Sequence, residues 1–222
     1  MDSIASLPEP IPPKRPSVSA SLERREVRAE RLIGLRVSEA ELTGDLSERA
    51  AADLRFDDVR LSRLDLSATE AAGLVLTDAL VSGGSWANLR ATRGALTRAE
   101  IEDVRATGVD LSEATVTDVA FMSSRFDLAS FRFATLERVV FDDCRLEEAD
   151  FHGATLSSVR FERCNLTAAS FSAARCERCE IRDCELTDLQ GVECLRGTRM
   201  RWNDVLQLTT LLAGAAGISI VD

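Results

Sequence analysis

Cysteine thiols are the side chains in this sequence best suited to binding a metal ion. Four of the six cysteines lie close together in the chain: Cys176, Cys179, Cys184 and Cys194. A Cys-x-x-Cys pair followed by further thiols is a ligand set that zinc uses in small structural sites. Core packing is the competing interpretation, and the direction in which the backbone points each thiol decides between them.

The residues that usually carry out acid–base catalysis are scarce. The chain has one histidine, His152, and no tyrosine. The carboxylate pairs Asp142-Asp143 and Glu147-Glu148 have no catalytic partner nearby in sequence and are expected to be solvated. Phosphate-binding loops, nucleophile elbows and dinucleotide fingerprints are absent from the sequence. We therefore predict that the protein is not an enzyme and binds no cofactor.

The charge of the chain excludes two classes of partner. The 222 residues carry a formal net charge of −10 and the pI is about 4.8, which argues against direct binding to nucleic acid or to an acidic membrane surface. The opening sequence has no apolar core of a secretory signal, and no apolar run is long enough for a membrane helix. We expect a cytoplasmic protein with reduced thiols.

A large apolar residue recurs at every fifth position from Phe56 to Leu186. These 27 positions include ten leucines and eight of the nine phenylalanines. The position two residues earlier takes small apolar residues, such as Ala99, Val119 and Cys144, and neither position holds a charge. A period of five fits neither a helix nor a strand. It fits a chain that turns a corner after every five residues and closes a square coil with every fourth corner.

Stacked coils of this kind form a rod whose core is filled by the two apolar positions. Adjacent coils lie about 4.8 Å apart, the spacing of paired strands, and 27 pentapeptides make about seven coils. Cys176 falls at a large-residue position, and Cys179 and Cys184 fall at small-residue positions. All three should therefore point into the core, as small apolar residues do, so we predict no metal site.

The pattern A-[D/N]-[L/F]-x-x resembles that of the pentapeptide repeat proteins. Local matches are Ala52-Asp53-Leu54, Ala149-Asp150-Phe151 and Ala169-Ser170-Phe171, and Ala40-Glu41-Leu42-Thr43-Gly44 fits in a different phase. The resemblance covers about residues 40–195. It implies an all-β fold, a right-handed quadrilateral β-helix. The coils that hold Ala71, Ala91 and Ala106 at the centre should be packed less tightly than the others.

Four segments are expected along the chain. All five prolines lie at or before Pro16, so residues 1–20 should form a solvated, disordered tail that resembles polyproline II. Residues 21–45 should form an N-terminal cap, with a short helix or strand in 21–35, and residues 46–191 the β-helix. Residues 192–222 should form a C-terminal cap. We expect a helix over about 203–214 with Asn203-Asp204 at its start, a stop at Gly217, and a short strand over 218–221.

Four candidate binding surfaces are expected, three formed by outward residues of the repeat and one by the C-terminal helix. The acidic face holds Glu100, Glu102, Asp103, Asp142, Asp143 and Glu162. The arginine column holds Arg105, Arg125 and Arg145. The apolar patch holds Met122, Leu128, Phe133 and Val140. The C-terminal helix offers Trp202, Val205, Leu208, Leu211 and Leu212 as a dimer surface.

Two functions are compatible with such a rod. The first is a scaffold that binds an unidentified protein through the apolar patch or the arginine column, as solenoids do with their long faces. The second is implied by the resemblance, because family members that protect DNA gyrase from quinolones are acidic rods similar to duplex DNA. The acidic face would then occupy a DNA-binding surface of a topoisomerase. The resemblance also implies a homodimer formed through the C-terminal helix.

Overall fold

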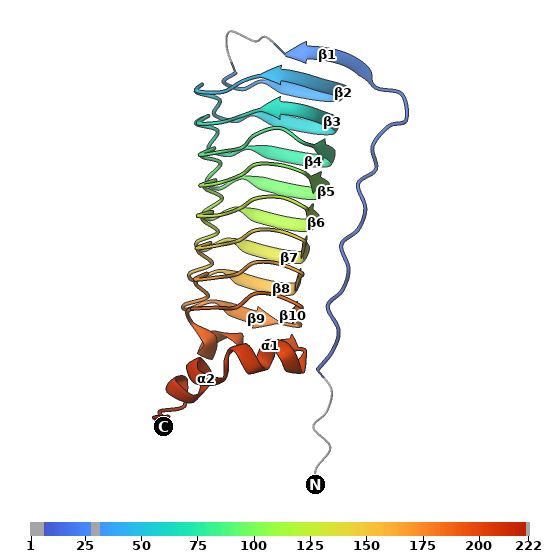
Figure 1. The fold of residues 1–222 in the computed structure, drawn as a ribbon. Helices are drawn as coiled ribbons and strands as arrows, with labels where there is room; N and C mark the ends of the chain where they lie inside the picture. The colour runs from blue at the N-terminus through green and yellow to red at the C-terminus, as the bar shows by residue number, and fades with distance from the viewer. Residues whose placement is uncertain (1–6, 28–31, 221–222) are drawn as a thin grey trace.

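The structure is a computed structural model that describes residues 7–27 and 32–220, and it forms a parallel β-solenoid of about nine turns. Figure 1 shows the coils stacked as a straight rod, with helices at its C-terminal end. The strands are β1 (Glu23–Val27), β2 (Arg36–Asp45), β3 (Arg55–Asp65), β4 (Val75–Ser82), β5 (Ala95–Glu102), β6 (Thr115–Met122), β7 (Thr135–Asp142), β8 (Thr155–Glu162), β9 (Arg175–Glu177), β10 (Glu180–Arg182) and β11 (Arg199–Met200).

The coils stack in a register of twenty residues, which is four pentapeptides per turn. Val119 pairs with Val139 and Val139 with Val159, always in parallel. On the sides without named strands, isolated bridges keep the same register, as between Arg125 and Arg145. The turn count exceeds the predicted seven because β1 and β2 continue the stack before the first in-phase pentapeptide.

The core is a closed column of side chains along the rod axis. The large-residue positions that the sequence identified are buried, from Phe56 to Leu186, with Cys176 alone half-buried. Phenylalanines stack between coils, with ring centroids 4.9 Å apart for Phe121 and Phe141 and 5.1 Å apart for Phe141 and Phe161. Burial of the aromatic rings supplies much of the stability of this part of the rod.

The corners of the coils explain the period of five. The residue two positions after each large core residue often has a left-handed backbone, for example Asp78 (φ 45°), Asp118 (φ 58°) and Arg138 (φ 52°). Aspartate and asparagine tolerate this conformation better than most residues. At Gly84 (φ 96°) no larger residue fits, because a Cβ would lie 2.3 Å from the carbonyl oxygen of Leu64.

The C-terminal cap differs from its prediction in two respects. The expected helix is split into α1 (Trp202–Gln207) and α2 (Thr209–Ala215), which follow a 3₁₀ turn, η1 (Val192–Leu195). The expected strand is not formed at 218–220, and Val221 lies outside the described residues. The short strand of the cap is β11 instead, which pairs in parallel with β10. The stop at Gly217 is confirmed, with φ 73° and a hydrogen bond from the Ile218 N–H to the Ala213 carbonyl oxygen.

Asp204 closes the last coil rather than the start of α1, which has no side-chain cap. Its buried carboxylate accepts hydrogen bonds from the backbone N–H groups of Asp183 and Cys184, each at 3.1 Å. Gln207 accepts from the Leu186 N–H at 3.0 Å and donates to the Cys184 carbonyl oxygen at 2.9 Å. These two side chains replace the backbone partners that a further coil would supply.

The N-terminal segment does not extend into solvent as the sequence predicted. Residues 7–20 lie alongside the rod, running from the β1 end towards α1 (Figure 1). Their amide groups bond to aspartates of several coils, for example from Ser19 to Asp58 at 2.7 Å. Residues 21–22 then lead into β1, which pairs with β2 and covers the first coil as a strand.

Candidate protein-interaction surfaces

The acidic face lies on the second half of each long strand and is not continuous. The register aligns Glu102, Met122, Asp142 and Glu162 in one column, and Glu100, Ala120, Val140 and Arg160 in the column beside it. Apolar side chains therefore separate the acids at the middle of the rod. A basic groove that recognises evenly spaced phosphates would meet only short acidic stretches here.

Arginines neutralise the C-terminal half of this face. Arg163 forms ion pairs with Asp142 and with Glu162, the latter at 2.9 Å. Asp143 accepts a hydrogen bond from the Ser123 hydroxyl at 3.4 Å. Of the six predicted acidic-face residues, the three without an ion pair or side-chain hydrogen bond among the described residues are Glu100, Glu102 and Asp103.

The face ends in a buried carboxylate, which the sequence analysis did not distinguish from its exposed neighbours. Glu180 is 6% exposed and binds Arg160 at 3.1 Å and Arg182 at 2.7 Å. Burial raises the pKa of Glu180, but the hydrogen bond and charge of Arg182 outweigh it and the net pKa is lowered. The carboxylate is therefore an ionised structural group.

The arginine column forms as predicted, with unequal members. Arg105, Arg125 and Arg145 are exposed and bridge in register on successive coils. Arg145 contacts Asp127 at 3.4 Å and Glu147 at 3.2 Å. Within the described chain Arg105 and Arg125 have no ion-pair partner, and they line an open cleft of about 380 Å³ together with Asp103, Val104 and Ser123.

The predicted apolar patch does not form one surface. Leu128 and Phe133, which are 57% and 56% exposed, occupy two different corners of one turn. Met122 and Val140 lie on the acidic face instead and are half-buried. The Phe133 ring packs edge-on against His152, with centroids 5.5 Å apart. Side-chain directions at corners separate residues that are close in sequence.

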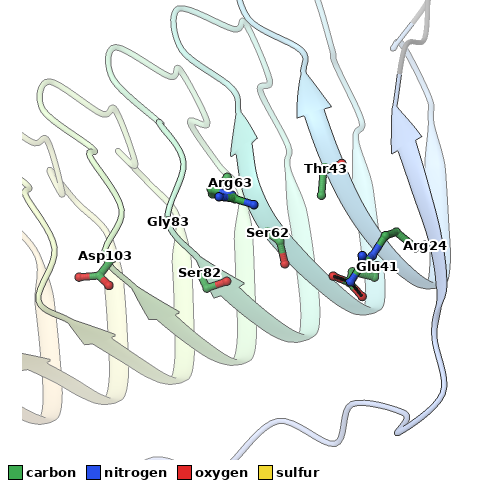
Figure 2. A pocket seen from close by; sticks show the side chains of 8 residues that line it. All are labelled: Arg24, Glu41, Thr43, Ser62, Arg63, Ser82, Gly83 and Asp103. Atoms are coloured by element: carbon green, nitrogen blue, oxygen red, sulfur yellow. Dashed lines mark hydrogen bonds and ion pairs between the residues drawn. The ribbon is translucent and has the colours of Figure 1, made fainter.

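A polar cleft of about 670 Å³ near the N-terminal end was not found from the sequence. Figure 2 shows Arg63, Gly83 and Asp103 following one another on successive coils, with Arg24 and Glu41 paired beside them at 3.2 Å. The glycine leaves a gap in a corner that elsewhere carries side chains. The signal for this cleft was Gly83 at an outward position, flanked by the small residues Ser62 and Ser82.

Cys179 and Cys184 are buried as the repeat predicted, whereas Cys176 is only half-buried. The Cys144 and Cys164 thiols are buried, and each donates to a carbonyl oxygen 23 residues earlier, Phe121 and Phe141, at 3.4 Å. The neighbouring thiols of Cys144 and Cys184, together with burial, raise the pKa of Cys164, so it stays protonated. Nowhere in the described residues do three metal-ligating side chains gather.

The C-terminal helices divide the predicted dimer surface between the rod and solvent. Leu208 is fully buried and Leu211 packs partly against the core, and Val205 is half-buried. Trp202 is 72% exposed and Leu212 is 39% exposed. Leu206, which was not among the predicted dimer residues, is 51% exposed. The outward set is therefore Trp202, Leu206 and Leu212.

None of the described helices is long and apolar enough to span a membrane.

Several solved structures are similar to this chain. HetL of Nostoc sp. strain PCC 7120, involved in heterocyst differentiation regulation, is 16% identical, with a TM-score of 0.40 over 80% of this chain and 86% of its own. A trypsin-treated variant of QnrB1, a plasmid-mediated fluoroquinolone resistance protein, is 17% identical, with a TM-score of 0.38 over 90% of this chain and 98% of its own. Rfr23 of Cyanothece 51142 has a TM-score of 0.21 at 14% identity over 65% and 88% of the two chains. No curated protein matches significantly.

One family model matches the chain, that of the pentapeptide repeat region, over residues 114–191. The twenty-residue register of this segment continues without interruption into the coils before it, through β5, β4 and β3. Residues 114–191 therefore carry the pentapeptide repeat, and the coils before them keep the same twenty-residue register.

Proposed function

We propose that this rod is a non-enzymatic binding module that holds a protein partner on an outer face. The observation that carries the proposal is the unpaired cationic pair, Arg105 and Arg125, stacked in register beside a cleft. Two guanidinium groups on adjacent coils suit a partner surface that presents carboxylates with similar spacing. The core of the described coils is filled by side chains, which favours binding on an outer face. Buried reduced thiols suit a cytoplasmic setting.

Site-specific crosslinking tests this assignment. A photoreactive residue at Ser123, which lines the cleft, should capture a partner that the same residue at Glu113, on a different corner, does not capture. Reversing charge in Arg105→Glu/Arg125→Glu should abolish capture, whereas Arg90→Glu/Arg93→Glu on another side should leave it intact. Equal capture from both crosslinker positions would refute the proposal.

The module is further proposed to act as a homodimer joined through α1 and α2. Trp202, Leu206 and Leu212 leave an exposed apolar surface at the end of the rod, where an isologous contact would cover them. Sedimentation of Trp202→Glu/Leu206→Glu should give a monomer where the unmodified chain gives a dimer. Leu128→Glu removes an equally exposed apolar side chain from the rod and should leave the dimer intact. A monomeric unmodified chain would refute the dimer.

Binding to DNA gyrase as a DNA mimic is the second candidate, and one observation favours it. Glu100, Glu102 and Asp103 form an acidic cluster without ion-pair partners among the described residues. In a gyrase supercoiling assay with and without a fluoroquinolone, the chain should inhibit the enzyme or protect it. Charge reversal of this cluster should remove the effect, while reversal at Asp142 and Glu162, already paired with Arg163, should weaken it less. An inactive folded chain eliminates this candidate.

A further inference from the structure

The N-terminal strap, residues 7–20, follows the rod in a regular register. The Ser17 N–H donates to Asp78 at 3.0 Å, and the Lys14 N–H, three residues earlier, donates to Asp118 at 3.0 Å. These two aspartates lie two coils apart. Towards the C-terminal end of the rod, Glu9 pairs with Arg199 at 3.1 Å. The strap therefore advances three residues for every two coils between Ser17 and Lys14.

The geometry of polyproline II accounts for that ratio. This helix has three residues per turn and a rise of about 3.1 Å per residue, or about 9.3 Å per turn. Two coils span about 9.6 Å. Prolines recur every third residue: Pro10 is buried and Pro13 and Pro16 are half-buried, whereas their neighbours Pro12 and Arg15 are exposed. One face of the strap thus meets the rod once per turn.

The rod carries a matching two-coil repeat on the corner beneath the strap. This Asp–Arg corner consists of Asp58, Asp78, Arg98, Asp118, Arg138, Ser158 and Arg178. Arg98 binds Asp78 at 2.8 Å, and Arg138 binds Asp118 at 2.6 and 2.9 Å. Each arginine comes from the coil after its aspartate. The arginines hold both oxygens of each carboxylate in place, and the Oδ1 that accepts from the arginine Nε also accepts the strap amide.

The donors in the strap follow the same rule. Polyproline II makes no internal hydrogen bonds, so its remaining N–H groups need outside acceptors. Lys14 and Ser17 each directly follow a proline that faces the rod. Beyond Pro16 there is no further proline, and the register changes, since Ser19 reaches Asp58 only one coil further on. The regular spacing is therefore a property of the proline repeat.

The third pair of the corner is incomplete. Ser158 stands where the repeat would place an aspartate, and Arg178 follows it on the next coil. In the described structure neither the buried Ser158 Oγ nor the Arg178 Nε has a hydrogen-bond partner. Extending the register by one turn brings Ile11, which follows Pro10, to the level of this coil.

We propose that the Asp–Arg corner is a binding surface for proline-rich peptides in the polyproline II conformation, and that the chain's own strap is its intramolecular ligand. The ligand class is a peptide with a proline at every third position, each followed by a residue that has an N–H group. Recognition uses a preformed ligand, as other modes of polyproline II recognition do, and adds a fixed row of acceptors. Because the strap is tethered to the rod, its high effective concentration keeps free peptides out.

Two experiments on the full-length chain test the proposal. In hydrogen exchange by NMR, the Lys14 and Ser17 amides should be protected, and Asp78→Ala or Asp118→Ala should remove protection at its own contact. Asp53→Ala on another corner is the control. Ser158→Asp should create a new protected amide at Ile11 without disturbing the rod. The proposed register between the strap and the Asp–Arg corner is wrong if the strap amides of the unmodified chain are unprotected, or if Ser158→Asp does not increase protection of the Ile11 amide.

The second experiment measures binding of a fluorescent peptide of residues 7–20. Lys14→Pro/Ser17→Pro keeps the strap extended but deletes both donors, so the exposed corner should bind the peptide at least about tenfold more tightly than the unmodified chain does. Asp118→Ala in that variant should abolish binding. Equal affinity for both chains overturns the proposal. If the chain forms a dimer, and dilution removes both the dimer and the amide protection of the strap, then each strap binds the other copy of the chain and the intramolecular assignment is wrong.

Discussion

At the large-residue positions, the C-terminal half of the rod, from Leu111 to Leu186, contains seven phenylalanines among its leucines, whereas the N-terminal half has Phe56 alone beside aliphatic residues and one tryptophan. The C-terminal half has pairs such as Phe131 and Phe151, with ring centroids 4.9 Å apart and planes within 2°. The N-terminal half has Ala71 and Ala91 at central positions, both fully buried. The same backbone coil therefore accepts two different cores.

The N-terminal half compensates for its small residues in two ways. Trp86 is 1% exposed and brings a large ring into the core on the side next to the Ala71 and Ala91 column. Its Nε1 has no hydrogen-bond partner among the described residues. Gly84 and Gly94 let coils approach closely, since a Cβ at Gly94 would lie 2.8 Å from the Leu74 carbonyl oxygen. The family model matches only the regular half, residues 114–191.

Removing an aromatic ring from the phenylalanine stack should have the largest effect. Phe141→Ala leaves a cavity between Phe121 and Phe161 and should lower the free energy of unfolding by about 3–5 kcal/mol. Urea denaturation followed by circular dichroism measures this. Phe56→Ala is the matched change in the N-terminal half, where no aromatic stacking partner lies above or below, and it should cost less than Phe141→Ala. Equal losses would mean that stacking adds nothing to burial.

A methyl group added at Gly84 should have the next largest effect. The new Cβ would lie 2.3 Å from the Leu64 carbonyl oxygen, and the φ of 96° is strained for alanine. Gly84→Ala should therefore destabilise the chain by about 2–3 kcal/mol. Gly73→Ala also has a positive φ, but its Cβ would make an ordinary contact of 3.5 Å with the Asp53 side chain. Gly73→Ala should therefore cost about 1 kcal/mol. Thermal denaturation of the two variants measures the difference, and a smaller difference than this would show that the coils can separate locally at Gly84.

A buried hydroxyl in the N-terminal half takes the place of the thiols in the C-terminal half. Thr69 Oγ1 donates to the Leu46 carbonyl oxygen at 2.8 Å, 23 residues earlier, in the same relation as Cys144 to Phe121. Thr69→Val leaves that oxygen without its side-chain donor and should cost about 1–3 kcal/mol. Thr69→Cys keeps a donor and should cost less. If both variants unfold at the same urea concentration, the hydrogen bond contributes nothing.

Much of the fold could be predicted from the sequence because the repeat acts on every residue. Inward positions carry no charge over 27 pentapeptides, so register, burial and the direction of the cysteines followed from counting. The surfaces were harder, because they depend on side-chain pairing between coils. Arg163 reaches Asp142, 21 residues away, and this contact breaks up a face that looks acidic in the sequence.

The ends and the strap escaped prediction for a different reason. Asp204 resembles a helix N-cap in sequence, yet its carboxylate accepts hydrogen bonds from the free amides of the last coil and not from the amides of α1. The prolines of the strap indicated polyproline II, but composition alone says nothing about docking. The missed signal was the match between a three-residue proline spacing and the 40-residue spacing of Asp78 and Asp118.

Acid should weaken the strap contacts, and only where the corner carries carboxylates. The Arg98 hydrogen bond lowers the pKa of Asp78 despite the opposing effect of burial, and the Ser17 amide lowers it further. A lowered native pKa gives stability that is present above the unfolded value of about 3.9 and is lost as pH falls through the native pKa. The Tm difference between the unmodified chain and Asp78→Asn should therefore shrink from pH 6 to about pH 2.5. Ser158→Ala, in the C-terminal half, is the control because the serine hydroxyl does not titrate. The Tm difference between this variant and the unmodified chain should be the same at both pH values. If it shrinks as much as the difference for Asp78→Asn does, the acid effect belongs to the whole rod rather than to the Asp78 carboxylate.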